Sequence, residues 1–476
     1  MSPYITQATE LIDWIVSNGG YIHPSAKLRI DGSTGLSVFA GKTINPDEKL
    51  VSCPFSLAVT SELATQAVCE IAGVEKGRLI WPKGHAKEGE PWNERMRIGA
   101  YLGFHWIYQE RPETEWPRSL VHKTYLASLP PASNLSTPLY FTESELQLLS
   151  GSNLLGAVED RRKEWSAESE VLRSILKEDG LTWLVLSVFE CHIQTPLNLF
   201  LPPRERYLAT ATYMSSRAFP SKLLDLSSDG EMTPQSTRID GVSKPVLLPG
   251  VDIFNHARGQ PILWLSSLVS TPNGSQGVPS VSLVSSSICE AGSQLFNNYG
   301  AKPNEELLLG YGFVLDSNPD DIVNLRLGIA SLPGPINERL QSKGLDARER
   351  FELKRNGEVD KRLLEMMRVL LGGGSEDDEV DDDDEHALHE KEEREMQLEL
   401  DVLGMLGGML EDKLEKLKAG SEIKVVDARE EVRRMCAMYR QGQMDILDAA
   451  MDKLSDRIER IESLMDEGMG GCPCCS

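Results

Sequence analysis

The sequence has few of the features that mark secreted or membrane-spanning proteins. Only eight of its 476 residues are cysteines, and five of these stand alone, which suits a reducing compartment better than a disulfide framework. No apolar run approaches the length needed to cross a bilayer, and the mainly apolar stretch 184–189 contains Ser187. Residues 1–15 lack a basic segment followed by an apolar one, so we expect no signal peptide. These absences predict a cytoplasmic protein, with a nuclear location also open and no membrane contact.

Basic residues are also in deficit. Lys and Arg number 49 against 73 Asp and Glu, which gives a formal net charge of −24. Phosphate binding requires a basic surface, so we do not expect nucleic acid as a direct ligand. Residues 376–395 hold thirteen acidic side chains against two basic ones, which predicts a solvated loop over 372–395. A basic protein partner for this stretch is the open alternative.

Metal ligands are sparse as well. No histidines occur at the spacing of a metal site, so we expect no catalytic metal. The tail contains Cys472, Cys474 and Cys475, but a fourth ligand is missing, and an exposed tail is the alternative to a structural zinc.

Helical and strand-type patterns alternate so that two β-rich segments flank a helical one, which predicts an α+β fold. We expect an N-terminal helix in 1–27, a β-rich segment at 28–90, a helical insert at 91–245, a second β-rich segment at 246–325, a helical region at 326–466 and a Cys-rich tail at 467–476.

Individual elements are predicted from periodicity and turn residues. Strands are expected at 36–40, 50–54, 246–248, 261–266, 281–286 and 294–297. Helices are expected at 5–18, 95–108, 142–149, 151–176, 182–193, 207–219, 302–309, 348–371 and 403–418, with one or two more in 430–464.

The most specific pattern lies between residues 249 and 313. Asp252 stands three residues before the pair Asn255-His256, and Asn298-Tyr299-Gly300 follows about forty residues later. A short leucine-rich helix then leads to Tyr311-Gly312-Phe313. Each piece alone means little, but their order and spacing together indicate one functional unit.

This pattern resembles the SET-domain methyltransferases, and most closely the subgroup of the Rubisco large-subunit lysine methyltransferase. The matching pieces are 34–40, 216–219, 249–256 and 298–313, with 439–447 similar to the last helix of that subgroup. The resemblance implies a SET β-fold of several small sheets with knot-like C-terminal threading. A helical insert would split this fold, and an all-α substrate-binding domain would follow it.

By the same resemblance the cofactor is S-adenosylmethionine and the acceptor is a protein lysine. Thr34, Gly35 and Leu36 would contact the cofactor through backbone groups, Arg217 would bind its carboxylate, and Asn255 and His256 would bind its adenine and amino-acid parts. Tyr299 would be the catalytic residue, oriented toward both the sulfonium and the amine. Tyr311 and Phe313 would line the lysine channel, with Phe313 also touching the cofactor, and Asp252 would position the substrate.

Each of these residues also has a purely structural reading. Tyr299 and Tyr311 could be half-buried core tyrosines, His256 a packed histidine, Arg217 a surface charge, and Thr34-Gly35 only a turn. Asp252 could equally be a structural cap for the turn that follows it. Ser37 stands where many SET domains have a second glycine, which weakens the assignment of the cofactor loop slightly.

The predicted function is lysine N-methylation of a non-histone protein, such as a ribosomal protein or a translation factor, by a monomeric enzyme. Two alternatives stay open: a protein-histidine methyltransferase, and a catalytically inactive SET-fold protein that binds peptides.

Overall fold

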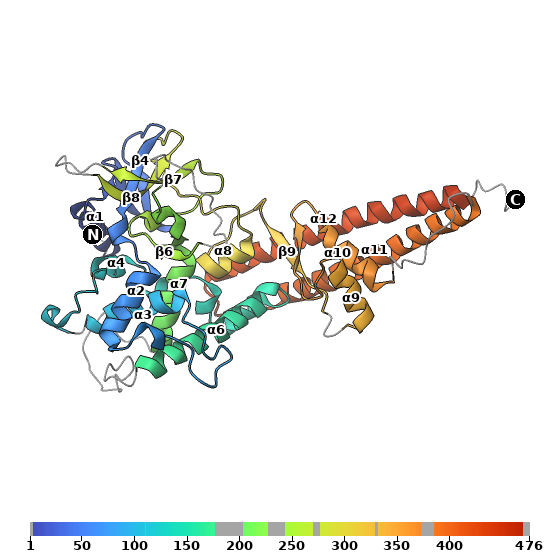
Figure 1. The fold of residues 1–476 in the computed structure, drawn as a ribbon. Helices are drawn as coiled ribbons and strands as arrows, with labels where there is room; N and C mark the ends of the chain where they lie inside the picture. Colours follow the sequence, from blue (N-terminus) through green and yellow to red (C-terminus); the bar gives the residue numbers. More distant parts are fainter. Residues whose placement is uncertain are drawn as a thin grey trace. The chain divides into compact units, whose positions relative to one another are not determined.

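The computed structural model describes residues 3–109, 111–176, 203–226, 243–269, 277–328, 332–372 and 385–469. The chain forms two compact units (Figure 1). Unit 1 comprises Met1–Leu135 and Asp160–Ala301, and unit 2 comprises Ser136–Glu159 and Lys302–Ser476. Part of the predicted helical insert, residues 136–159, therefore groups with the C-terminal region.

Unit 1 contains three small antiparallel sheets. The largest has the strand order β1-β4-β8-β7, and the other two are the pairs β2-β3 and β5-β6. The strands are β1 (Tyr21–Ile22), β2 (Ala26–Asp31), β3 (Gly35–Ala40), β4 (Glu48–Pro54), β5 (Ala218–Pro220), β6 (Pro245–Leu247), β7 (Ile262–Val269) and β8 (Val278–Ser285). β4 and β8 lie at the centre of the sheet and are buried along most of their length, as expected for strands covered on both faces.

Helices fill the rest of unit 1. They are α1 (Pro3–Ser17), α2 (Ser61–Ala72), α3 (Glu94–Tyr108), α4 (Lys123–Ser128) and α7 (Pro203–Arg217), together with the second part of α6 (Asn153–Leu176). α3 packs against α2 and α7, and α1 packs against α4. Eleven of the fifteen residues of α3 are buried, so this helix forms the centre of the helical part.

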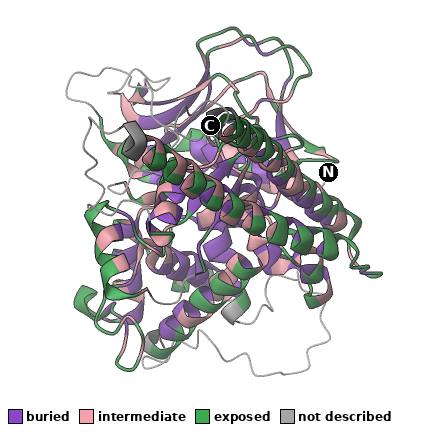
Figure 2. Ribbon diagram, turned by 90° about the vertical axis from the view of Figure 1, so that its right-hand side faces the viewer, coloured by how far each residue is buried: buried purple, intermediate pink, exposed green. Residues whose placement is uncertain are grey.

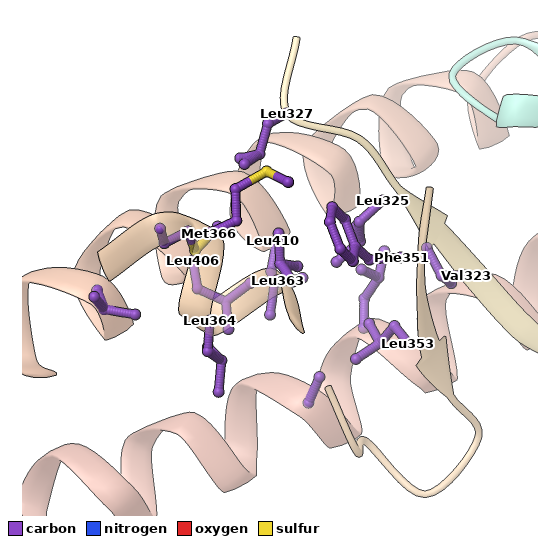
Figure 3. Close-up of a cluster of buried hydrophobic side chains, with 14 of the residues drawn as sticks. Val323, Leu325, Leu327, Phe351, Leu353, Leu363, Leu364, Met366, Leu406 and Leu410 are labelled. Carbon is purple, nitrogen blue, oxygen red and sulfur yellow. The ribbon is translucent and has the colours of Figure 1, made fainter. Parts of the chain in front are cut away.

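Unit 2 is mainly helical. Its elements are α5 (Glu143–Leu146), α8 (Asn304–Tyr311), β9 (Ile322–Leu325), α9 (Gly334–Ser342), β10 (Phe351–Lys354), α10 (Lys361–Leu370), α11 (Glu385–Ser421) and α12 (Glu430–Met469). Its core joins β9 and β10 to one face of α10 and α11 (Figure 3). Leu406, Leu410, Leu414 and Leu417 are all buried, as their helical spacing predicts. The long helices carry buried residues on one side and exposed residues on the other (Figure 2).

Two predicted elements of unit 2 are wrong. The single helix predicted at 348–371 is instead strand β10, a turn and helix α10. β10 alternates buried and exposed residues and pairs with β9, a period of two that its charged residues concealed. The predicted acidic loop is helical from Glu385 onward, and its charges form i,i+4 pairs such as Arg394–Glu390 that support a helix.

Other predictions differ less from the structure. Residues 294–297 make only isolated bridges, with Phe39 and His256, instead of a regular strand. The region after 430 is one helix, α12. The predicted helix at 182–193, the residues 373–384 of the acidic stretch and the cysteines of the tail lie outside the described residues.

Neither a membrane span nor a metal centre is found in the described part of the chain. No helix there is long and apolar enough to cross a bilayer. No group of three or more His, Cys, Asp or Glu residues there could hold a metal ion.

Candidate functional site

The loop that joins β2 to β3 is held from within by Asp31. Its Oδ1 accepts hydrogen bonds from the backbone N–H groups of Ser33 (2.8 Å) and Thr34 (3.1 Å), and from both of their hydroxyls. These bonds lower the pKa of Asp31 to about 2, so the carboxylate stays charged at neutral pH. Gly35 follows with φ +69°, a conformation that favours glycine, and a Cβ there would meet open space. The loop is thus ordered, while its outer side is accessible.

Asn255 fastens this loop from the other half of the split β-fold. Its Nδ2 donates to Ser37 Oγ at 2.9 Å and lies 3.2 Å from the carbonyl oxygen of Leu36 and 3.4 Å from that of Thr34. Ser37 is fully buried, and its hydroxyl lies 2.8 Å from that of Thr34. The serine at the expected glycine position is therefore part of the contact that joins the two halves.

Asp252 lies at the centre of a buried cluster. Its Oδ2 accepts from the Tyr125 hydroxyl at 2.8 Å and from Arg217 Nη1 at 3.3 Å, and its Oδ1 accepts from the backbone N–H of Gly250 at 3.1 Å. Arg217 Nη1 also donates to the Asp252 carbonyl at 3.0 Å. Burial raises the pKa of Asp252, and its three donors oppose that rise. Because the side chain has no exposed surface, the geometry favours the structural reading of Asp252 over direct substrate contact.

Tyr299 is packed against His256. The two rings are stacked with centroids 5.0 Å apart, and the backbone N–H of Tyr299 donates to His256 Nδ1 at 3.0 Å. The Tyr299 hydroxyl donates to the carbonyl of Phe254 at 2.9 Å. Burial raises the pKa of Tyr299 to about 12, so the phenol stays protonated at neutral pH. The hydroxyl is therefore a fixed, neutral polar group.

Asn297 supports this arrangement and was not singled out from the sequence. Its Oδ1 accepts from Trp264 Nε1 and from the backbone N–H of Asn298, both at 2.8 Å. Its backbone N–H donates to the carbonyl of Asn255 at 2.7 Å, and its carbonyl accepts from Ala257 N–H at 2.9 Å. Asn297 therefore aligns the segment that carries His256 with the segment that carries Tyr299. Its place two residues before Tyr299 was the available signal.

Tyr125 was also missed, because its partner Asp252 lies 127 residues away and no local pattern marks it. Eight of the ten predicted site residues lie in unit 1 with Tyr125: Thr34, Gly35, Leu36, Arg217, Asp252, Asn255, His256 and Tyr299. The structure joins Thr34 and Leu36 to Asn255, and Arg217 to Asp252.

The last two predicted site residues lie in unit 2. Tyr311 ends α8, and its ring meets that of Phe313 edge to face with centroids 6.1 Å apart. Lys302 Nζ lies 5.7 Å from the centroid of the Tyr311 ring, a cation–π contact. Both rings are partly exposed. Their predicted role in a lysine channel stays a prediction.

Sequence comparison links the chain to lysine methyltransferases. It is 30% identical over 330 residues to ribosomal lysine N-methyltransferase set10 of Schizosaccharomyces pombe, covering 67% of this chain and 48% of the relative. It is 25% identical over 350 residues to protein-lysine N-methyltransferase EFM1 of Saccharomyces cerevisiae, covering 68% and 53%. Weaker similarity, 23% over 323 residues, covers 67% of the chain and 44% of the actin-histidine N-methyltransferase of Gallus gallus. The chain thus spans about half the length of these relatives. No protein-family model matches the chain.

Structural comparison identifies the fold. The SET domain of LSMT bound to lysine and AdoHcy aligns with a TM-score of 0.65 at 17% identity, covering 97% of this chain and 93% of the other. Rubisco LSMT bound to AdoMet aligns with a TM-score of 0.63 at 18% identity, covering 99% and 98%. These alignments confirm the predicted fold, a SET fold with a helical C-terminal region, and with the sequence relatives they confirm the resemblance to the Rubisco methyltransferase subgroup.

Proposed function

We propose that this chain, which has the fold of the Rubisco methyltransferase subgroup, is an S-adenosylmethionine-dependent protein-lysine N-methyltransferase. The observation that carries the proposal is the setting of Tyr299. Its neutral hydroxyl donates to the Phe254 carbonyl and its ring stacks on that of His256, in the same unit as the Arg217–Asp252 pair.

The residues present fit the cofactor. Among the described residues, Arg217 makes hydrogen bonds only through Nη1, so its Nε and Nη2 groups remain for a carboxylate, the partner to which a guanidinium is best suited. The loop at 34–36 is held from below by Asn255, with open space beside Gly35. We assign the cofactor carboxylate to Arg217 and the remainder of the cofactor to 34–36, Asn255 and His256. When bound, the cofactor supplies a methyl group activated by a sulfonium.

Tyr299 orients the acceptor amine in this proposal. Because its proton is donated to the Phe254 carbonyl, the phenol oxygen meets an amine as an acceptor of its N–H. The raised pKa keeps the phenol from becoming an anion that would hold the amine in its charged form. A neutral lysine amine has a lone pair for attack, and alignment supplies much of the rate.

The relatives are named for ribosomal proteins and for protein lysine in general, so we propose a ribosomal protein or a translation factor as the substrate. We further propose that the enzyme acts as a monomer in the cytoplasm or the nucleus and contacts neither nucleic acid nor membrane. The similarity to an actin-histidine methyltransferase makes protein histidine the second candidate acceptor.

Labelled cofactor tests this proposal directly. The purified chain, incubated with methyl-labelled S-adenosylmethionine and acid-extracted ribosomal proteins, should label at least one protein. Tyr299→Phe should lower the initial rate about 100-fold, because a positioned polar group in a methyl-transfer site is worth a few kcal/mol. Mapping the labelled residue by mass spectrometry separates lysine from histidine.

Tyr207→Phe is the matched control, because its hydroxyl bonds to Glu168, in a different hydrogen-bonded cluster of the same unit. It should keep the activity of the unmodified chain. No cofactor binding and no labelled protein would contradict the proposal, and equal activity of Tyr299→Phe and the unmodified chain would remove Tyr299 from it.

A further inference from the structure

The Arg217 guanidinium is held by a carboxylate that is itself held by Tyr125. Tyr125 lies on α4, in the helical insert, and is completely buried. Its hydroxyl donates to the same Asp252 oxygen, Oδ2, that Arg217 reaches, at 2.8 Å against 3.3 Å for the arginine. The tyrosine bond is the shorter of the two, so Tyr125 is the closer donor to that oxygen.

The other oxygen of Asp252 is also occupied. Oδ1 accepts from the backbone N–H of Gly250, which has φ +80°. Each oxygen of the carboxylate therefore accepts a hydrogen bond from a group other than Arg217. Asp252 holds Arg217 through one nitrogen and from two directions, its carbonyl and its carboxylate.

This arrangement leaves part of the Arg217 side chain accessible to a ligand. The Arg217 side chain is 23% exposed, whereas the Asp252 side chain is not exposed at all. Without the Tyr125 hydroxyl, Oδ2 would keep only the longer bond from Arg217, and a buried carboxylate that loses a donor is costly. Asp252 would then draw Arg217 inward or take up a proton, and in either case the guanidinium would leave its present orientation.

We infer that Tyr125 is a positioning residue that orients Arg217, through Asp252, toward a carboxylate ligand. The inference rests on the proposed function, in which that carboxylate belongs to S-adenosylmethionine. It assigns Asp252 to the support of the cofactor site, where the sequence had placed it at the substrate. It also brings a second residue of the helical insert into the support of cofactor binding, one that lies more than ninety positions before Arg217 in the sequence.

The test compares two ligands that differ only in the carboxylate. Binding of S-adenosylmethionine and of decarboxylated S-adenosylmethionine is measured by calorimetry on the full chain and on Tyr125→Phe. The variant should bind S-adenosylmethionine about fivefold to tenfold more weakly, as expected for losing one hydrogen bond to a charged group. Its affinity for the decarboxylated ligand should be unchanged, which general damage to the site would not produce.

Tyr207→Phe is the control, because it removes a hydroxyl from another buried carboxylate, Glu168, which also pairs with an arginine. It should leave both affinities unchanged. Asp252→Asn is the second variant, should Tyr125→Phe fail to fold, and we expect it to show the same selective loss.

Equal affinities of Tyr125→Phe and the full chain for S-adenosylmethionine would overturn the inference while leaving the proposed function intact. So would a loss of the same size for both ligands. Failure of the unmodified chain to bind either ligand would instead overturn the proposed function itself, and the inference with it.

Discussion

Two buried clusters in unit 1 are each built from a tyrosine, an arginine and a carboxylate. In one, Tyr207 and Arg95 meet Glu168, and in the other Tyr125 and Arg217 meet Asp252. Both carboxylates are buried, and both tyrosine hydroxyls donate to them, at 2.6 Å and 2.8 Å respectively. Composition and burial alone therefore do not distinguish a structural cluster from a ligand site.

The difference lies in how each arginine uses its donors. Arg95 binds Glu168 through Nε at 2.9 Å and Nη2 at 2.6 Å, also pairs with Glu164, and lies over the Trp165 ring. Among the residues that the structure describes, Arg217 forms hydrogen bonds through Nη1 alone. An arginine that donates two N–H groups to one carboxylate stabilises the fold. An arginine that is held at a single nitrogen keeps donors for a ligand.

The largest expected effect comes from Glu168→Ala, which removes the carboxylate that Arg95 and Tyr207 share. Arg95, Asn93 and Tyr207 would lose their shared acceptor, leaving a charge in a partly buried setting. We expect a loss of about 3–5 kcal/mol in the free energy of unfolding, measured by urea denaturation. The S-adenosylmethionine affinity of the folded fraction should stay the same.

Glu164→Ala removes only the partly exposed partner of Arg95 and should lower stability by less than about 1 kcal/mol. A large fall in cofactor affinity for Glu168→Ala would contradict the distinction between the two clusters.

We expect acid to destabilise the protein through two buried histidines close to the cluster of Tyr125, Arg217 and Asp252. His105 and His122 are buried, and the His122 ring contacts that of Tyr125. Burial lowers the pKa of His105 to about 3 and that of His122 to about 4, against about 6.5 for an unfolded chain. Because the folded pKa values are depressed, the stabilisation is complete above about pH 6.5 and is lost as the pH falls toward 4. At pH 5 each histidine should lower the unfolding free energy by roughly 2 kcal/mol.

Denaturation midpoints measured between pH 7.5 and 5 check this expectation. His122→Gln keeps a donor for the Leu57 carbonyl and removes one titrating group, so it should show a weaker dependence on pH. A stability that does not change over this range would contradict the neutral, buried state of both rings.

The smallest expected effect concerns the loop at 34–37. Asn255→Ala removes the side chain that joins this loop to the second half of the β-fold. We expect the KM for S-adenosylmethionine to rise about tenfold, because ordering the loop on binding would require the free energy of roughly one hydrogen bond. Asn45→Ala, which removes a bond to Glu48 in an exposed turn of the same unit, should leave KM unchanged. An unchanged KM in Asn255→Ala would show that the loop is held by Asp31 alone.

The split β-fold could be predicted because its signals are local. The strands at 36–40 and 50–54 follow from apolar runs between turn residues, and the structure has strands β3 and β4 there. The wrong prediction of one helix over 348–371 also had a local cause. Charged residues between Arg348 and Lys361 imitate a helix surface, whereas the pairing of β10 with β9 decides the strand.

The candidate site could be predicted only where residues stand within a motif. Asn255, His256 and Tyr299 were named from their spacing, and the structure brings the last two into contact. Tyr125 had no such marker, because a buried tyrosine looks the same in sequence whether its hydroxyl meets a carbonyl or a carboxylate.

By itself, the sequence determined the order of the segments, most of the helices and the motif residues, since periodicity and turn chemistry act over a few positions. The tertiary structure was needed to show that Arg95 binds a carboxylate through two nitrogens and Arg217 through one. It was also needed to show that Ser37 meets Asn255 across 218 positions. The physical reason is that a hydrogen bond depends on where two side chains meet in space, and the path of the chain between them sets that position.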